Sequence, residues 1–443
     1  MTLIDQSPYE WLSFDENGAL TDSAALGRVL ADLNSSGAAD LVVIAHGWKT
    51  DQVGAGQLYT PLWENVSKSL VADGGPAPQK IVVVGVVWPS KAFEDDFDVA
   101  AAKTASGGTL AVPPAVTGDG DLDPAALDKV IDGYRELVGS AQGDAVAVAA
   151  ARNTAGYDAA SAADLLNVLK AAAGLTGGQH DSELTADAAG LLKDPVTILD
   201  MLAPLPNLPV PPSVGGTLDL GGALSNAIQG PRAAIARLLN QFTYFTMKQR
   251  AGTVGRKLGA DVLSTLTPTH PTRRHLIGHS FGARLVTAAA AAFKPSALLS
   301  LQSLTLLEGA YSHNGLSSDF DGGQSGAFAS VLTSQLVDGP ISMSHTHNDS
   351  ACTIAYPLAS RLSRDVSQGL GDAQDVFGAM GANGAQNLPA AAYAADQAMV
   401  EGQATYCLTP GKVNRVLGDA CISEHMDVTN SDVGALVASV LRA

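Results

Sequence analysis

Two different hydrophobic patterns follow one another along the first 90 residues, continuous apolar runs and apolar residues spaced three or four apart. The runs DLVVIAHG (40–47) and KIVVVGVVWPS (80–90) are apolar almost without a break. This pattern indicates strands buried on both faces, as in a parallel sheet covered by helices. Residues 23–33 and 58–72 instead carry apolar residues at spacings of three and four, which predicts helices. With a short strand at 9–14, the order is strand, helix, strand, helix, strand.

The same alternation returns after residue 230. A helix is predicted over 231–252, where Pro231 suits a first helical turn. Its apolar stripe comprises Ile235, Leu238, Leu239, Phe242 and Phe245. The sequence therefore predicts an α/β fold with a mainly parallel, doubly wound sheet. The remaining predicted elements are strands at 275–278, 304–310, 340–349 and somewhere within 404–420, and helices at 283–293, 352–362 and 431–443.

Residues 91–230 interrupt this order with acidic clusters, alanine-rich stretches and the proline-rich run PLPNLPVPPSVGG. Apolar spacings of three and four at 127–138 and 163–175 predict helices. We expect a large, mostly helical insertion between two parts of one core, 1–90 and 231–443. Because it leaves the sheet at its carboxyl edge, it is expected to form a cap that lines an apolar pocket. The alternative is a separate helical domain through which the protein forms a homo-oligomer.

Charge and composition exclude several functional classes. The chain has 443 residues and a net charge of -18, which would repel nucleic-acid phosphates and anionic lipid headgroups. The longest dense apolar run, at 81–88, is too short to cross a bilayer, and the first residues do not resemble a signal peptide. We therefore expect a cytoplasmic protein without nucleic-acid partners. The three cysteines show no Cys-x-x-Cys spacing, so neither disulfides nor a zinc site are indicated.

The clearest candidate for catalysis is Ser280, in the stretch GHSFG at 278–282. This Gly-x-Ser-x-Gly motif lies where an apolar strand passes into a helix. Glycines there permit the sharp bend that exposes a seryl oxygen above a sheet, beside the amino terminus of the helix. We interpret Ser280 as a nucleophile, and a structural turn serine is the alternative. The backbone N–H groups of Phe281 and of Trp48, in the HGW turn at 46–48, would complete an oxyanion hole.

Chain order selects the base and the acid. Hydrolases of the doubly wound type carry serine, acid and histidine in that order, with the histidine in a loop before the last helix. Of nine histidines, His425 alone meets this description. For the acid, Asp349 closes the strand at 340–349, Glu308 closes the strand at 304–310, and Asp321 is a weaker candidate. We predict Asp349, with Glu308 as its rival.

A different chemistry is suggested by His345-x-His347-x-Asp349, which places three potential metal ligands on alternate residues. No second cluster of ligands accompanies them in the sequence, and alternation at a strand end explains the spacing equally well. We therefore predict no metal and no cofactor.

Together, HGW at 46–48, Trp88-Pro89-Ser90, GHSFG, the Asp349 strand end and His425 resemble the α/β-hydrolase superfamily. More narrowly, the chain is similar to bacterial α/β-hydrolases loosely described as serine esterases. The resemblance covers about 1–90 and 231–443 and leaves 91–230 unmatched. It implies a Ser-His-Asp mechanism on a small-molecule carboxylic ester, with a thioester or an amide as alternatives.

Two further functions stay open at this stage. One is a catalytically silent protein of the same fold that binds a ligand beneath its cap. The other is an acyltransferase of fatty-acid synthesis, a family that also uses a Gly-His-Ser-x-Gly turn. A glutamate commonly follows the second glycine in that family, whereas Ala283 follows it here.

Overall fold

The computed structural model of the chain describes residues 2–90, 117, 120–175, 194–203, 229–320, 322–355 and 378–443. The chain divides into two compact units. The first comprises 1–91, 247–357 and 371–443, and the second comprises 92–246 and 358–370. Among the described residues, no helix combines the length and the apolar character needed to cross a membrane.

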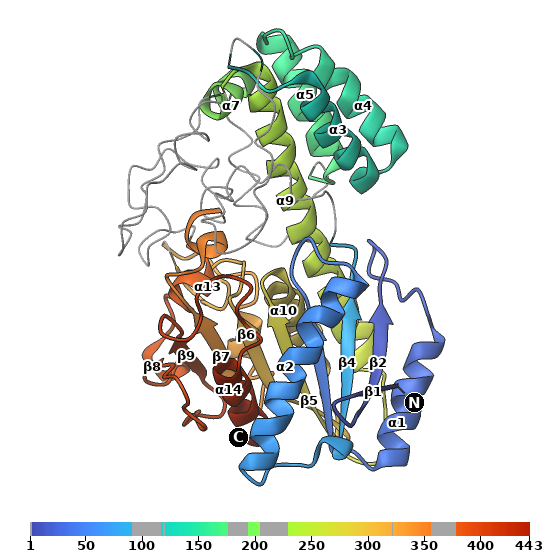
Figure 1. Cartoon of the computed structure of the whole chain (residues 1–443), viewed down its shortest axis with the longest axis vertical. Helices are drawn as coiled ribbons and strands as arrows, with labels where there is room; N and C mark the ends of the chain where they lie inside the picture. The colour runs from blue at the N-terminus through green and yellow to red at the C-terminus, as the bar shows by residue number, and fades with distance from the viewer. Residues whose placement is uncertain are drawn as a thin grey trace. The chain divides into compact units, whose positions relative to one another are not determined.

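The first unit is built on one mixed sheet that is parallel except at one edge (Figure 1). Its strands lie in the order β1-β2-β4-β3-β5-β6-β7-β9-β8, and only β1 pairs antiparallel with its neighbour. The predicted α/β class with a mainly parallel sheet is thus confirmed. The strands are β1 (Thr2–Ile4), β2 (Ser7–Ser13), β3 (Asp40–Ala45), β4 (Ile81–Val87), β5 (Thr272–His279), β6 (Leu299–Leu307), β7 (Ile341–His345), β8 (Gln397–Ala398) and β9 (Val413–Leu417).

Helices cover both faces of this sheet, as the continuous apolar strands require. Helix α2 (Gln52–Ala72) packs beside α14 (Ser431–Arg442), and both contribute to one apolar core with Val42, Ile44 and Ile277 of the strands. Figure 1 shows this pair in front of the sheet and α10 (Phe281–Ala292) behind it. Helix α1 (Ala24–Ser36) packs against β2.

Glycines hold α10 against the end of the long helix α9 (Pro231–Lys257) and the π-helical turn Leu258–Leu263 that follows it. A Cβ at Gly255 would lie 2.1 Å from the carbonyl oxygen of Leu285, and one at Gly259 equally close to that of Ala289. Real Cβ atoms never approach so closely, so the two backbones are in direct contact. This packing fixes the helix that begins at Ser280.

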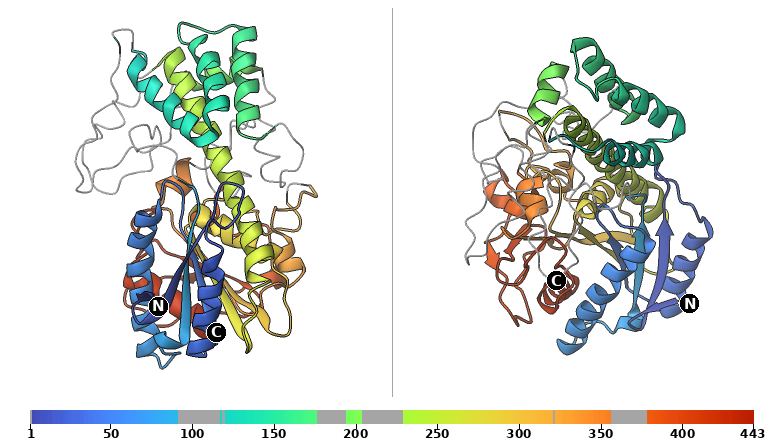
Figure 2. Two further views of the ribbon diagram at one scale, coloured as in Figure 1. Left: turned by 90° about the vertical axis from the view of Figure 1, so that its right-hand side faces the viewer. Right: turned by 45° about the horizontal axis from the view of Figure 1, so that its top comes forward.

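The described part of the second unit is helical. It contains the part of α9 up to Thr246 and four further helices, α3 (Pro124–Val138), α4 (Ser140–Ala151), α5 (Ala159–Ala172) and α7 (Pro195–Leu202). Among these four, each packs against the next in chain order (Figure 2, blue-green to green). Asp123, Asp158 and Asp194 cap three of them by accepting backbone N–H groups. The helices predicted at 127–138 and 163–175 are therefore present, whereas the role of this unit as a cap stays a prediction.

Some elements differ from the sequence predictions. The helix predicted at 58–72 begins six residues earlier, where Asp51 accepts the N–H of Gly54. Strands β1 and β8 were not expected, because two or three residues are too few to show a period. Of the helix predicted at 352–362, only the π-helical turn Ala351–Ala355 lies among the described residues.

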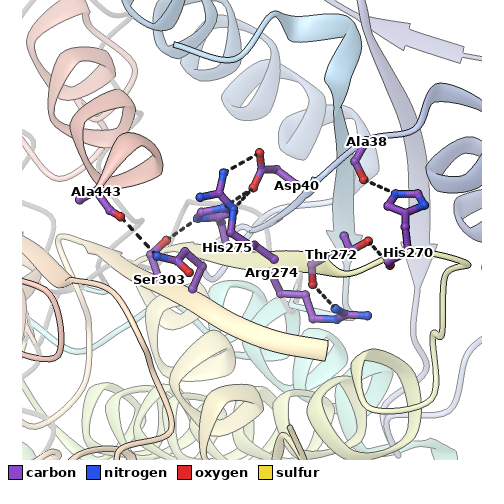
Figure 3. Close-up of polar contacts among 10 residues, drawn as sticks. Ala38, Asp40, His270, Thr272, Arg274, His275, Ser303 and Ala443 are labelled. Carbon is purple, nitrogen blue, oxygen red and sulfur yellow. Dashed lines mark hydrogen bonds and ion pairs between the residues drawn. The ribbon is translucent and has the colours of Figure 1, made fainter. Parts of the chain in front are cut away.

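A buried line of polar side chains crosses β3, β5 and β6 in their amino-terminal halves (Figure 3). His275 Nδ1 lies 2.8 Å from Ser303 Oγ, and His275 Nε2 lies 3.1 Å from Asp40 Oδ1. Arg273 pairs with both oxygens of the same aspartate, at 2.7 and 3.0 Å. Because His275 and Ser303 are fully buried, this line acts as a satisfied polar network inside the sheet.

Candidate active site

Ser280 occupies the turn between β5 and α10 in a strained backbone conformation. Its φ is 59° and its ψ is -125°, a region that residues with a side chain rarely adopt. The flanking glycines are required by packing. A Cβ at Gly278 would lie 2.3 Å from the carbonyl oxygen of Gly282, and one at Gly282 would lie 2.2 Å from that of Ala45. The Gly-x-Ser-x-Gly motif therefore forms the sharp strand-to-helix turn that its sequence predicts.

The HGW turn lies directly against Ser280. A Cβ at Gly47 would lie 2.6 Å from the Cβ of Ser280 and 3.0 Å from its Oγ, so only glycine fits there. This approach brings the segment that contains Trp48 beside the hydroxyl. The ring of Trp48 also lies 6.0 Å from the ring of Phe281, between centroids. The two residues predicted to supply oxyanion donors are thus neighbours.

His46 positions this turn and is buried. Its Nδ1 lies 2.9 Å from the carbonyl oxygen of Gly47, and its ring stacks on Trp88 at 5.7 Å. The Nε1–H of Trp88 donates to the carbonyl oxygen of His46 at 2.9 Å. Burial lowers the pKa of His46 to about 4, so the ring is neutral at pH 7. The Trp88-Pro89-Ser90 stretch therefore serves to hold the HGW turn, which the sequence did not reveal.

Asp349 and His425 are brought together at 2.6 Å, between Oδ2 and Nδ1. Asp349 is fully buried and follows β7, while the His425 side chain, 19% exposed, lies in the loop between β9 and α14. Burial would lower the pKa of His425, but the charge of Asp349 and their hydrogen bond outweigh it and raise that pKa above its ordinary value. Burial likewise opposes ionisation of Asp349, yet His425 and the N–H of Cys352 keep its pKa low. Asp349 is therefore an anion that orients the imidazole.

His279 connects this pair to the serine turn. Its Nε2 lies 2.8 Å from the carbonyl oxygen of His425, and the two rings are 4.8 Å apart between centroids. Since His279 immediately precedes Ser280, the His425 loop is bound to the chain beside the candidate nucleophile. Burial, followed by the nearby charge of His425, lowers the pKa of His279 to about 3. The sequence predicts a strand that ends at Gly278, just before His279, and contains no sign of this contact.

Glu308, the rival acid, follows strand β6, which pairs with the strand that precedes Asp349, β7. It follows the last residue of β6 with a φ of 45°, and its side chain is fully buried. Burial and the negative charge of Asp349 raise the pKa of the Glu308 carboxyl well above its ordinary value. No hydrogen bond between Glu308 and a histidine is found among the described residues. The weaker candidate Asp321 lies outside the described residues.

Three other described histidines make hydrogen-bond contacts away from Asp349 and His425. His275 belongs to the line with Asp40 and Ser303, and His270 contacts the carbonyl oxygen of Ala38. His313 contacts Asn383. His180 lies outside the described residues. No hydrogen bond joins His275, His270 or His313 to the Asp349 carboxylate among the described residues.

The His-x-His-x-Asp residues do not come together as ligands of one ion in the described ranges. His347 Nδ1 pairs with Asp419 at 2.9 Å, and Asp349 pairs with His425. A different trio, Asp349, Cys352 and His425, has potential ligand atoms within 4.8 Å of one another. Burial and the two neighbouring carboxyl groups raise the pKa of the Cys352 thiol well above its ordinary value. We therefore do not assign these residues as metal ligands.

Comparison with known proteins identifies no relative. No protein-family description, curated protein or solved structure matches this chain.

Proposed function

We propose that this protein is a serine hydrolase of the α/β-hydrolase type that cleaves a carboxylic ester. The observation that carries the proposal is the strained turn at Ser280, between a parallel strand and the amino terminus of a helix. Strain of this kind is retained where it serves a function, and it lifts the hydroxyl away from the sheet. The pairing of Asp349 with His425 supports it, as does the chain order of serine, acid and histidine.

In this mechanism the Ser280 hydroxyl attacks the ester carbonyl while His425 Nε2 takes its proton. Asp349, bound to Nδ1, stabilises the imidazolium that forms. The backbone N–H groups of Phe281 and Trp48 bind the oxyanion, and the proton returns to the departing alcohol. Water, deprotonated by His425, then releases the acid from the acyl-enzyme. No cofactor takes part in these steps.

A fluorophosphonate probe tests this proposal directly. An activated serine reacts with the probe, whereas ordinary serines do not. We expect one equivalent of label on the wild-type protein, located on Ser280 by peptide mass spectrometry, and none on Ser280→Ala. The buried Ser303 is a matched control, because Ser303→Ala leaves the proposed site intact. Absence of label on the wild-type protein would instead favour the silent binding protein.

The substrate class needs a second measurement. A series of p-nitrophenyl esters of increasing acyl length, assayed with and without alcohol or thiol acceptors, separates hydrolysis from acyl transfer. We expect free acid as the product in both cases. Acylated acceptor as the main product would support the acyltransferase alternative.

A further inference from the structure

Two buried carboxyl groups follow neighbouring strands of the sheet, and one of them contacts the proposed base. Asp349 follows β7 and accepts the hydrogen bond of His425, while Glu308 follows the neighbouring strand β6. Both are fully buried. Two negative charges on buried carboxyl groups at the ends of neighbouring strands would repel, which favours a proton on one of them.

The hydrogen-bond partners of the two carboxyl groups indicate that Glu308 holds this proton. Asp349 receives the N–H of Cys352 at 2.9 Å in addition to the imidazole, and both donors stabilise its charge. The two carboxyl oxygens of Glu308 have no hydrogen-bond partner of ordinary geometry among the described residues. The Ser344 hydroxyl and the Thr346 N–H favour the charged form of Glu308, but burial and the charge of Asp349 outweigh them and raise its pKa. An ionised carboxyl group without well-placed donors is costly to bury, whereas a protonated one can itself donate to a neighbouring carboxylate.

The fold also holds Glu308 rigidly in this place. Its φ of 45° is unfavourable for a residue with a side chain, so the structure imposes the position. A Cβ at Gly381 would lie 2.6 Å from the carbonyl carbon of Glu308 and 2.7 Å from Cys352 Sγ. The Cys352 thiol contacts the carbonyl oxygen of Glu308 at 3.5 Å.

We propose that Glu308 is a positioning residue, whose neutral carboxyl group donates to Asp349 and keeps that carboxylate anionic and aimed at His425. The inference rests on the proposed function of the Ser280 site. Among the described residues, the titratable groups around the pair include His425, His279, the Cys352 thiol and Glu424, whose charge acts on His425. Without the donor, the charge of Asp349 would be less dispersed and would hold the imidazolium more strongly.

Two substitutions separate this role from a structural one. In Glu308→Gln the amide N–H still donates, so we expect kcat/KM within about threefold of wild type and an unchanged acid limb of the pH profile. Glu308→Met has a similar length but no donor. We expect it to lose about tenfold in kcat/KM, with its acid limb moved to higher pH, while its melting temperature matches that of Glu308→Gln. Equal pH profiles for the two variants would overturn the proposal.

Infrared difference spectroscopy tests the proton without any enzymatic assay. A protonated carboxyl group absorbs at higher frequency than a carboxylate, so wild-type protein at pH 7 should show one buried carboxylic acid band that Glu308→Gln lacks. If that band is absent from the wild-type protein, Glu308 is ionised and the inference is wrong, whatever the activity. If the band is present but no variant reacts with a fluorophosphonate, the proposed hydrolase function is wrong while the protonation of Glu308 stands.

Discussion

The imidazole of His425 is bound to Asp349 at 2.6 Å, although 76 residues separate them in the sequence. Three strand ends, those of β5, β7 and β9, precede Ser280, Asp349 and His425. Because parallel strands end at one edge of a sheet, residues far apart in the chain meet there. The predictions below test whether this meeting point is catalytic.

The nucleophile and the base should act as one unit. We expect Ser280→Ala and His425→Ala each to lower kcat by about 10⁵- to 10⁶-fold, and the double variant to lose no more than either alone, because neither residue works without the other. Steady-state hydrolysis of a p-nitrophenyl ester checks this. Substantial turnover by His425→Ala, together with a large loss in His345→Ala or His313→Ala, would show that the base is misassigned.

Asp349 and Glu308 should differ sharply in their contribution to turnover. Asp349→Asn should lower kcat by about 10⁴-fold, since an amide at this position holds the imidazole in the wrong tautomer. Glu308→Gln should cost far less, because only Asp349 contacts the ring. The same kinetic assay ranks the two variants. A reversed ranking would assign the acid to the end of β6.

Much of this arrangement could be predicted from the sequence because it depends on short patterns. The apolar runs at 40–47 and 80–90 predicted β3 and β4, and GHSFG predicted the turn at Ser280. The relation between Glu308 and Asp349 could not be predicted. It depends on the pairing of β6 with β7 and on how deeply both side chains are buried, which the local pattern does not contain. The stacking of His46 on Trp88 could not be predicted either, because it depends on the pairing of β3 with β4.

Gly47 should be irreplaceable for activity. A Cβ there would collide with Ser280 at 2.6 Å, so Gly47→Ala must displace either the HGW turn or the nucleophile. We expect a loss of at least 100-fold in kcat/KM, since misplacement by about 1 Å can cost that much. Gly56→Ala is the control, because Gly56 lies in α2 with nothing within 4 Å of its added Cβ. Equal activity of the two variants would contradict the close approach.

Stability should fall as the pH drops from about 6.5 to 5. Burial lowers the pKa values of His46, His279 and His345 to about 4, about 3 and about 4, whereas the unfolded chain has histidine pKa values of about 6.5. For each of these histidines the unfolded state therefore binds about half a proton more at pH 6.5 and nearly one proton more at pH 5. Each proton corresponds to a slope of about 1.4 kcal/mol per pH unit in the free energy of unfolding. His425, whose pKa is raised, opposes part of this change.

Urea unfolding at several pH values measures that slope. His279→Gln should reduce it by about one proton, because glutamine does not titrate. A wild-type slope near zero between pH 5 and 6.5 would be inconsistent with buried neutral histidines.

The cap assignment for 91–230 predicts a change in specificity. Replacing 94–226 with a short Gly/Ser linker should leave Ser280 reactive toward a small fluorophosphonate, while altering the preference among ester chain lengths. Labelling of Ser280 is the control for a folded first unit. If chain-length preference stays the same and light scattering shows a smaller assembly, the segment serves self-association.

The line of Asp40, His275 and Ser303 has a practical consequence for annotation by geometry. It contains the three residue types of a hydrolase triad within hydrogen-bond distance, and β5 carries its histidine only five residues before Ser280. A template search that matches residue types and distances would return Asp40, His275 and Ser303 as a false match in addition to the proposed site. In this line the aspartate lies on Nε2 and the serine on Nδ1, whereas His425 has its aspartate on Nδ1, and the Ser303 hydroxyl is fully buried. Ring orientation and solvent access therefore discriminate where composition and proximity fail.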